Sequence, residues 1–319
     1  MDFVLLILGF VILIFGADKL VDGASSLASK FGIPNIVIGL TVVAFGTSAP
    51  ELFVNVVAAL NNNTQMVLGN VIGSNIFNVL MILGICSLFY PLEVKRNTTW
   101  LEIPLSLLAG LMVLIISNDI FIDKGESNII SSSDGIILFC FFLIFQVYTM
   151  EVAKSETSSE QFETENYSKP KSLLFIILGL AGLVIGGELI VTSAVSIAST
   201  VGISERIIAL TIVSTGTSLP ELVTSLVAVR KKNVDIALGN IVGSNIINIF
   251  FILGISAFIT PLKVEDSNHT EIYVNIYANV LLFFFILVGK GRKIDRWEGV
   301  VLLTSYLIYI LMLFFNIGF

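Results

Sequence analysis

The sequence predicts an all-α polytopic membrane protein whose ten transmembrane helices form two inverted five-helix repeats. Three observations predict this fold class: an apolar composition, a series of long apolar segments, and an internal repeat. Hydrophobic residues make up 55% of the chain and charged residues 13%, and the mean hydropathy is +0.96. These values are typical of polytopic membrane proteins and lie outside the range of soluble domains. The lipid bilayer is therefore the expected environment of the chain.

Charge and cysteine content exclude other classes of protein. The net charge of −7 arises mostly from acids in the loops 118–127 and 151–165, where water solvates them. The sequence shows no basic patch of the kind that binds nucleic acid, so nucleic-acid binding is not expected. No obligate protein partner is expected either. Cys86 and Cys140 lie in apolar runs without metal-ligand spacing, so they are interpreted as core residues. The N-terminus lacks a basic region and a cleavage site, so it is expected to be a retained first span.

Ten segments approach the ~20 apolar residues that a spanning helix needs. They cover residues 3–29, 33–60, 66–90, 99–117, 132–152, 171–199, 203–229, 235–260, 271–289 and 297–317. The loops after the first, third, fifth, seventh and ninth segments contain 13 lysines and arginines, whereas the other loops contain three. Cytoplasmic loops carry the excess of these residues. Both termini are therefore expected to lie outside, in a multi-pass protein of the cell membrane.

The internal repeat has an offset of 170 residues. It aligns GTSAPEL (46–52) with GTSLPEL (216–222) and LGNVIGSNIFN (68–78) with LGNIVGSNIIN (238–248). Between 41–80 and 211–250, 19 of the 40 positions are identical. The chain thus divides into a repeat at 1–152, a polar cytoplasmic linker at 153–170, and a repeat at 171–319. Five spans per copy require opposite orientations in the membrane, as in many secondary transporters.

Each repeat interrupts a spanning helix and surrounds the interruption with oxygen-bearing groups. Pro50 and Pro220 remove backbone donors, so the carbonyls near Ala44 and Ser214 are expected to lose their helical hydrogen bonds. The polar groups of the repeats are Thr47, Ser48, Glu51, Ser74, Asn75, Asn78, Thr217, Ser218, Glu221, Ser244, Asn245 and Asn248. Carboxylate, hydroxyl, amide and carbonyl oxygens are the ligands that hard cations such as Ca²⁺ prefer. The glycines of the second motif favour close helix approach, which would bring the ligands of both repeats onto a common centre.

These motifs resemble the α-repeats of the sodium/calcium exchanger (cation/calcium antiporter) superfamily, and the whole chain is similar to its compact prokaryotic members. The resemblance implies a site between the two repeats, at mid-membrane, where Glu51 and Glu221 bind Ca²⁺. It also implies sodium sites, formed with Thr47, Ser48, Ser74, Thr217, Ser218, Ser244 and the carbonyls of Ala44 and Ser214. It further implies that the first and sixth helices slide against the remaining helices. Ca²⁺ and Na⁺ would be transported substrates, and no cofactor is expected.

Several positions keep two interpretations. Asn78 and Asn248 belong to the predicted ligand set, with interhelical hydrogen bonding as the alternative. Several members of the superfamily carry an acid where this chain has Asn248, so the resemblance fixes neither the stoichiometry nor a role for potassium. Asp18 and Glu188 are a further duplicated pair of acids, with structural and ion-pathway roles equally open.

Three functional classes compete with sodium-coupled antiport. An intramembrane enzyme is disfavoured because GTSAP is not a nucleophile elbow, and the only histidine, His269, is predicted in a loop. A cation channel could use a carboxylate ring, but broken helices in inverted repeats fit alternating access better. Proton-coupled calcium antiport stays open, because the same glutamates could carry protons.

Overall fold

The structure of the chain is a computed structural model that describes residues 2–122, 124–155, 167–200, 214–288 and 291–315. Nearly all of its regular structure is helical, with η denoting π-helical segments. The first half contains α1 (Asp2–Phe31), α2 (Asn35–Ile38), η1 (Gly39–Val43), α3 (Ala44–Thr47), α4 (Ala49–Leu60), α5 (Thr64–Ile76), η2 (Phe77–Ile82), α6 (Leu83–Phe89), β1 (Leu92–Glu93), η3 (Thr98–Glu102), α7 (Ile103–Ile116), α8 (Asp119–Ile122), β2 (Ile129–Ile130) and α9 (Ser132–Ser155). The second half contains α10 (Lys169–Thr200), α12 (Ser214–Gly216), α13 (Leu219–Arg230), α14 (Val234–Ile246), η5 (Ile247–Leu253), α15 (Gly254–Ile259), β3 (Leu262–Lys263), α16 (Asp266–Val288), β4 (Lys293–Ile294) and α17 (Arg296–Phe315).

The helices confirm a polytopic membrane fold. Within the described residues, eight helices are long and apolar enough to cross a membrane. Asn35–Thr47 and Ala49–Leu60 pass the same test together but are bent by 47° relative to each other, as in a broken span or a re-entrant loop. The first part of the predicted span 203–229 lies outside the described residues. Most of the linker predicted at 153–170 also lies outside them. The count of ten spans therefore stays a prediction.

The chain forms two compact units, and each unit draws on both halves of the sequence. Unit 1 comprises Met1–Pro50 and Thr149–Ile241. Unit 2 comprises Glu51–Tyr148 and Val242–Phe319. The boundaries predicted at 152 and 171 separate the two sequence repeats, whereas the compact units are defined by contacts in space. The repeat boundaries therefore stay a prediction.

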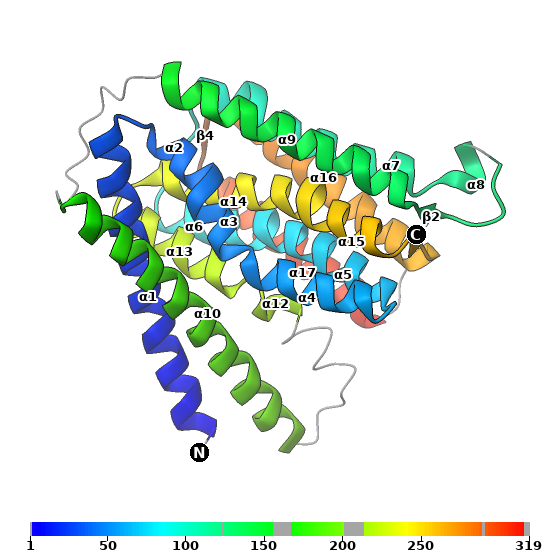
Figure 1. The fold of residues 1–319 in the computed structure, drawn as a ribbon, viewed down its shortest axis with the longest axis horizontal. Helices are drawn as coiled ribbons and strands as arrows, with labels where there is room; N and C mark the ends of the chain where they lie inside the picture. Colours follow the sequence, from blue (N-terminus) through cyan, green and yellow to red (C-terminus); the bar gives the residue numbers. More distant parts are fainter. Residues whose placement is uncertain (1, 123, 156–166, 201–213, 289–290, 316–319) are drawn as a thin grey trace. The chain divides into compact units, whose positions relative to one another are not determined.

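In unit 1, α1 lies beside α10 (Figure 1), and a seam of glycines joins the two helices. The close backbone contacts pair Gly9 with Gly186, Gly16 with Gly179, and Gly23 with Ser172. This order shows that the two helices run antiparallel. Seven-residue spacing keeps the glycines on one face of each helix, because seven residues complete almost two turns. A Cβ added at Gly16 would lie 2.9 Å from the carbonyl oxygen of Gly179, so only glycine permits this approach.

Unit 2 combines apolar packing with buried polar pairs. Its helix α7 lies along α16, where the Ser106 hydroxyl donates to Oδ1 of Asn279 at 2.8 Å. The phenol of Tyr148 in α9 donates to Oε1 of the buried Glu102 at 2.7 Å. Two short antiparallel ladders, β1 with β4 and β2 with β3, join the loops between these helices. Hydrogen-bonded polar side chains inside a membrane protein hold helices together where hydrophobic burial gives little net drive.

The cysteines occupy two different environments. Cys86 is buried in α6, as expected of a core residue, and Cys140 is exposed on α9. The interpretation of Cys140 as a core residue was therefore wrong. Exposed apolar side chains are abundant on the same helix, including Ile144 at 62% exposure, because a lipid-facing surface needs no polar covering. Both thiols are free.

The glycine seam generates a prediction with a matched control on the same helix. A Cβ at Gly179 would lie 2.6 Å from the backbone nitrogen of Leu20, whereas a Cβ at Gly187 would meet its first neighbour at 3.8 Å. Overpacking costs about 1 to 3 kcal/mol, and both changes gain up to about 1 kcal/mol of helix propensity. Gly179→Ala is therefore expected to lower the Tm of the detergent-solubilised protein, and Gly187→Ala is expected to maintain or raise it. Equal Tm values for the two variants would contradict the seam.

Candidate functional site

The two proline-containing motifs interrupt their helices in the same way. Helix α3 ends at Thr47, and Ser48 takes φ −82° and ψ 6° before α4 begins at Ala49. In the other repeat, Ser218 takes φ −89° and ψ 5° before α13 begins at Leu219. This bridge conformation is sparsely populated and recurs at functional sites. Proline fits within the first turn of the following helix, where a backbone donor is not needed. Each break therefore leaves a serine and a glutamate at the start of a helix inside an apolar span.

Both glutamates are buried at these breaks. Glu51 and Glu221 are each 1% exposed. A buried carboxylate loses the hydration that stabilises its charge, so a counter-charge or strong hydrogen bonds must compensate. Each glutamate lies in the first turn of its helix, where the helix dipole favours negative charge by about 0.3 to 1 kcal/mol. That contribution is too small to offset the burial of a charge in an apolar span.

Unit 1 brings groups from both repeats onto Glu221. The Ser48 hydroxyl donates to Oε1 of Glu221 at 3.1 Å. Ser48 itself is 1% exposed, so its lone pairs face a protein interior. A hydroxyl that donates its only hydrogen to a carboxylate presents its oxygen as an acceptor elsewhere, which suits a cation. The two repeats thus meet at the contact between Ser48 and Glu221, and the role of these residues as ligands stays a prediction.

Asn240 connects the two breaks within unit 1. Its Oδ1 accepts from the Thr47 hydroxyl at 3.0 Å. Its Nδ2 donates to the Ser225 hydroxyl at 3.0 Å and to the backbone carbonyl of Glu221 at 3.3 Å. Asn240 is completely buried, and both hydrogens of its amide are used. This side chain therefore holds the Thr47 hydroxyl in a fixed orientation beside the backbone that carries Glu221.

Unit 2 contains the asparagine ligand candidates. Nδ2 of Asn78 donates to Oδ1 of Asn245 at 3.0 Å, and Nδ2 of Asn248 donates to Oδ1 of Asn75 at 3.0 Å. The interhelical hydrogen bonds that were the alternative interpretation are thus present. Oδ1 of Asn78 and Oδ1 of Asn248, however, are buried, and no described protein group donates to either of them. The amide nitrogens serve structure, and the oxygens stay available as ligands.

One expectation about the break was wrong. The carbonyl of Ala44 keeps its helical donor, because the backbone nitrogen of Ser48 donates to it at 3.0 Å. The Thr47 hydroxyl lies 3.3 Å from the same carbonyl. A proline removes the donor to the carbonyl four residues earlier, which for Pro50 is Gly46 rather than Ala44. Ligation by the Ala44 carbonyl would therefore use its second lone pair.

The remaining predicted ligands divide between the units. Ser218 in unit 1 and Ser74 and Ser244 in unit 2 are buried, and Thr217 in unit 1 is partly exposed. Ser214 begins α12, and its side chain lies outside the described residues. Within the described residues, no three or more His, Cys, Asp or Glu side chains form a metal-binding group.

Sequence reasoning missed Asn240 and Ser225 as members of the hydrogen-bond network at the helix breaks. Asn240, Ser244 and Asn248 are spaced four residues apart, which places them on one face of the α14–η5 helix. Asn70, Ser74 and Asn78 show the same spacing in the other repeat. Ser225 follows Glu221 by four residues, as Asn55 follows Glu51, and Asn55 donates to the backbone carbonyl of Glu51 at 2.7 Å. The recurring interval of four was the signal that could have identified them.

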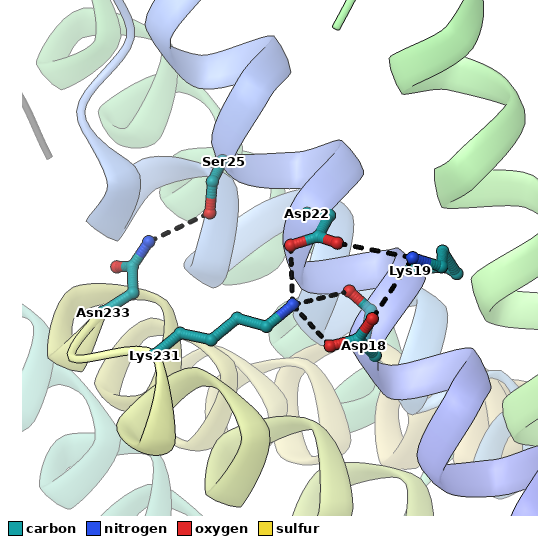
Figure 2. A network of polar contacts seen from close by, with 6 residues as sticks. All are labelled: Asp18, Lys19, Asp22, Ser25, Lys231 and Asn233. Atoms are coloured by element: carbon teal, nitrogen blue, oxygen red, sulfur yellow. Dashed lines mark hydrogen bonds and ion pairs between the residues drawn. The ribbon is translucent and has the colours of Figure 1, made fainter. Parts of the chain in front are cut away.

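The duplicated acids Asp18 and Glu188 have different environments. Lys231 forms ion pairs of 2.6 Å with Asp18 and with Asp22, and Lys19 lies 3.3 Å from Asp18 (Figure 2). Beside this network, Nδ2 of Asn233 donates to the Ser25 hydroxyl at 3.0 Å. These contacts tie α1 to the end of α13 and to the turn before α14. They favour a structural role for Asp18, whereas Glu188 is exposed on α10.

Comparisons with known proteins place this arrangement in context. The family model for "Sodium/calcium exchanger protein" matches residues 1–150 and 171–315. The chain is 36% identical to "Putative antiporter CaxA" of Alkalimonas amylolytica, covering 92% of each chain. It is 34% identical to "Sodium/calcium exchanger MaX1" of Methanosarcina acetivorans, covering 99% of each chain. A solved structure of the "sodium-calcium exchanger NCX_Mj" superposes with a TM-score of 0.83 at 34% identity, covering 97% of each chain.

Asn240 generates a prediction for stability. Asn240→Ala would remove the hydrogen bonds to the Thr47 hydroxyl, the Ser225 hydroxyl and the Glu221 carbonyl. The Thr47 hydroxyl can still donate to the Ala44 carbonyl, and each buried group that is left unsatisfied costs about 1 to 3 kcal/mol. The Tm of the detergent-solubilised protein is expected to fall by about 5 °C or more. Asn61→Ala, at an exposed position in the turn after α4, is the control and is expected to change the Tm by less than about 2 °C. Similar losses for both variants would argue against the bridging role of Asn240.

Proposed function

The chain belongs to the sodium/calcium exchanger protein family, and from this premise we propose that it is a secondary active antiporter exchanging Ca²⁺ for Na⁺ by alternating access. The observation that carries the proposal is the burial of Glu51 and Glu221, each 1% exposed, at symmetric breaks in apolar helices. Both relatives and the solved structure described above are named as antiporters or exchangers. None of those names describes an enzyme.

The ligand chemistry favours hard cations. Glu51 and Glu221 supply two negative charges, so one Ca²⁺ or two Na⁺ would neutralise them. In the proposed assignment the hydroxyls of Thr47, Ser48, Ser74, Thr217, Ser218 and Ser244, the amide oxygens of Asn78 and Asn248, and the carbonyls of Ala44 and Ser214 complete the coordination. Neutral oxygens of this kind bind Na⁺ and Ca²⁺ without adding charge. One Ca²⁺ and two Na⁺ carry the same total charge, which supports the exchange of one Ca²⁺ for two Na⁺ at the same site.

Energetics explain why a calcium exporter needs a coupled ion. Moving Ca²⁺ against a ~10⁴ gradient costs about 5.5 kcal/mol, at about 1.4 kcal/mol per decade. Moving its two charges outward against about 100 mV adds about 4.6 kcal/mol. The total of roughly 10 kcal/mol must come from ions that enter down their own gradients. Two or three Na⁺ can supply a large part of it, and protons are the second candidate because glutamates can carry them.

The proposed architecture is ten transmembrane helices in two inverted five-helix repeats, in the cell membrane, with both termini outside. The glycine seam supports the inversion, because Gly9 and Gly16 of α1 are equivalent by the 170-residue offset to Gly179 and Gly186 of α10. Two equivalent helices that pack antiparallel through equivalent residues are what an inverted repeat requires. The lysine and arginine excess in alternate loops supports the orientation.

The test of the function is Ca²⁺ uptake by proteoliposomes loaded with Na⁺, compared with K⁺ loading and with an imposed pH gradient. Na⁺ loading is expected to drive uptake because Na⁺ is the proposed counter-ion, and K⁺ loading is expected not to drive it. The exchange is also expected not to require K⁺, because no third carboxylate is present to balance an additional K⁺. Glu51→Gln and Glu221→Gln are each expected to abolish the Na⁺-driven uptake, since one carboxylate cannot balance Ca²⁺.

Glu102→Gln is the matched control for the glutamate variants. Glu102 is also buried, but it lies on η3 and accepts a hydrogen bond from Tyr148. Its replacement is expected to leave at least half of the uptake rate. Uptake driven by a pH gradient and not by Na⁺ would establish proton coupling instead. Robust uptake by folded Glu51→Gln or Glu221→Gln protein would contradict the assigned site.

The proposed orientation makes a separate prediction. In a background of Cys86→Ala and Cys140→Ala, single cysteines are introduced at Lys154 and at Asn61, both exposed in the structure. A membrane-impermeant maleimide added to intact cells is expected to label Asn61→Cys and not Lys154→Cys, because only the turn after α4 is predicted outside. Opening the cells is expected to expose Lys154→Cys to the reagent. The reverse pattern would invert the orientation.

A further inference from the structure

Four asparagines in unit 2 form a reciprocal hydrogen-bond network. Asn75 lies on α5 and Asn78 on η2, and their repeat equivalents Asn245 and Asn248 lie on α14 and η5. Each of the four side chains is 1% exposed. The side chain of Asn75 contacts Asn245 and Asn248, and the side chain of Asn245 contacts Asn75 and Asn78. Each repeat therefore orients an asparagine of the other.

Backbone carbonyls fix the direction of every bond in this network. Nδ2 of Asn75 donates to the carbonyl of Asn245 at 3.1 Å. A carbonyl can only accept, so the amide nitrogen of Asn75 must face it. Oδ1 of Asn75 therefore points the other way, where it accepts from Nδ2 of Asn248 at 3.0 Å. The amide of Asn248 has one orientation that satisfies this contact.

The second pair follows the same logic with the repeats exchanged. Nδ2 of Asn245 donates to the carbonyl of Asn75 at 3.5 Å, the longest of these contacts. Oδ1 of Asn245 then accepts from Nδ2 of Asn78 at 3.0 Å. The backbone carbonyl of Asn75 thus sets the orientation of Asn245, and Asn245 in turn sets the orientation of Asn78.

The consequence is a pair of amide oxygens aimed away from the network. Oδ1 of Asn78 and Oδ1 of Asn248 are both buried without a described donor. A buried acceptor left unsatisfied costs about 1 to 3 kcal/mol. Two symmetric costs of this kind are expected where a ligand supplies the missing interaction, and a cation is the ligand that an oxygen without a donor attracts. The reversed amides would present hydrogens and repel it.

We propose that Asn75 and Asn245 are positioning residues that hold the amide oxygens of Asn248 and Asn78 toward the transported cation. This inference rests on the proposed function, because it deepens the description of the same site. Neither positioning residue supplies a ligand: each acts by accepting a hydrogen bond from the ligand asparagine. An aspartate at position 248 would need no such help, since both of its oxygens can bind a cation and it has no hydrogens to direct elsewhere.

The test is a double-mutant cycle read as Ca²⁺ affinity of the detergent-solubilised protein, measured by titration calorimetry. Asn75→Ala is expected to weaken Ca²⁺ binding about tenfold in the native background, because the amide of Asn248 is then free to turn its hydrogens toward the site. In the Asn248→Asp background the same Asn75→Ala change is expected to cost less than about twofold. Asn279→Ala, which removes a bonded asparagine elsewhere in unit 2, is the control and is expected to leave the affinity within twofold.

Equal losses of affinity in the two backgrounds would overturn the proposal, since a merely structural asparagine would be needed in both. If Asn75→Ala does not fold, the equivalent cycle of Asn245→Ala with Asn78→Asp gives the same decision. Binding is measured without transport, so the two proposals fail separately. Ca²⁺ binding with the expected cycle, but without Na⁺-driven uptake, would overturn the antiporter and support the positioning role. Na⁺-driven uptake, together with an equal loss of Ca²⁺ affinity from Asn75→Ala in both backgrounds, would support the antiporter and overturn the positioning role.

Discussion

The burial of two carboxylates inside apolar helices is the constraint on which the other features of this protein depend. Glu51 and Glu221 are almost inaccessible, and burying an uncompensated charge in a membrane protein is costly. The helix breaks bring serine and threonine hydroxyls to these positions, and Ser48 reaches Glu221 across the repeats. A mobile cation supplies the remaining compensation in the proposed function, so the cost of burial and the affinity for the ion have one origin.

Neutral polar side chains form a buried hydrogen-bond network in each of the two units. Asn240 uses its whole amide to connect Thr47, Ser225 and the backbone of Glu221. The asparagine network of unit 2 binds the amide nitrogens of Asn78 and Asn248 and leaves their two oxygens without a described donor. Amides suit this work because each one combines an acceptor with two donors, and none of them changes the charge balance of the site. In the proposed site, Asn248 leaves the charge at minus two, where an acid at that position would make it minus three.

The sequence predicted features that depend on local pattern. Apolar segment length predicted the polytopic fold, and the paired prolines predicted the breaks that appear at Ser48 and Ser218. Features that depend on contacts between distant segments escaped it. The carbonyl of Ala44 keeps its donor from Ser48, because a proline deprives the carbonyl four residues earlier, which for Pro50 is that of Gly46. Asn240 was missed because its role appears only when Thr47, 193 residues away, lies beside it. The exposed position of Cys140 was missed because composition cannot distinguish the two faces of an apolar helix.

The glycine seam between α1 and α10 also limits how this interface can evolve. A side chain introduced at Gly179 would collide with the backbone nitrogen of Leu20 and the carbonyl of Gly16. Substitution of the partner residue leaves those backbone atoms in place, so no compensating replacement on the facing helix can make room. Interfaces built from side chains drift by paired exchanges of large and small residues. This one cannot accumulate such second-site suppressors, and each glycine of the seam is therefore under selection on its own.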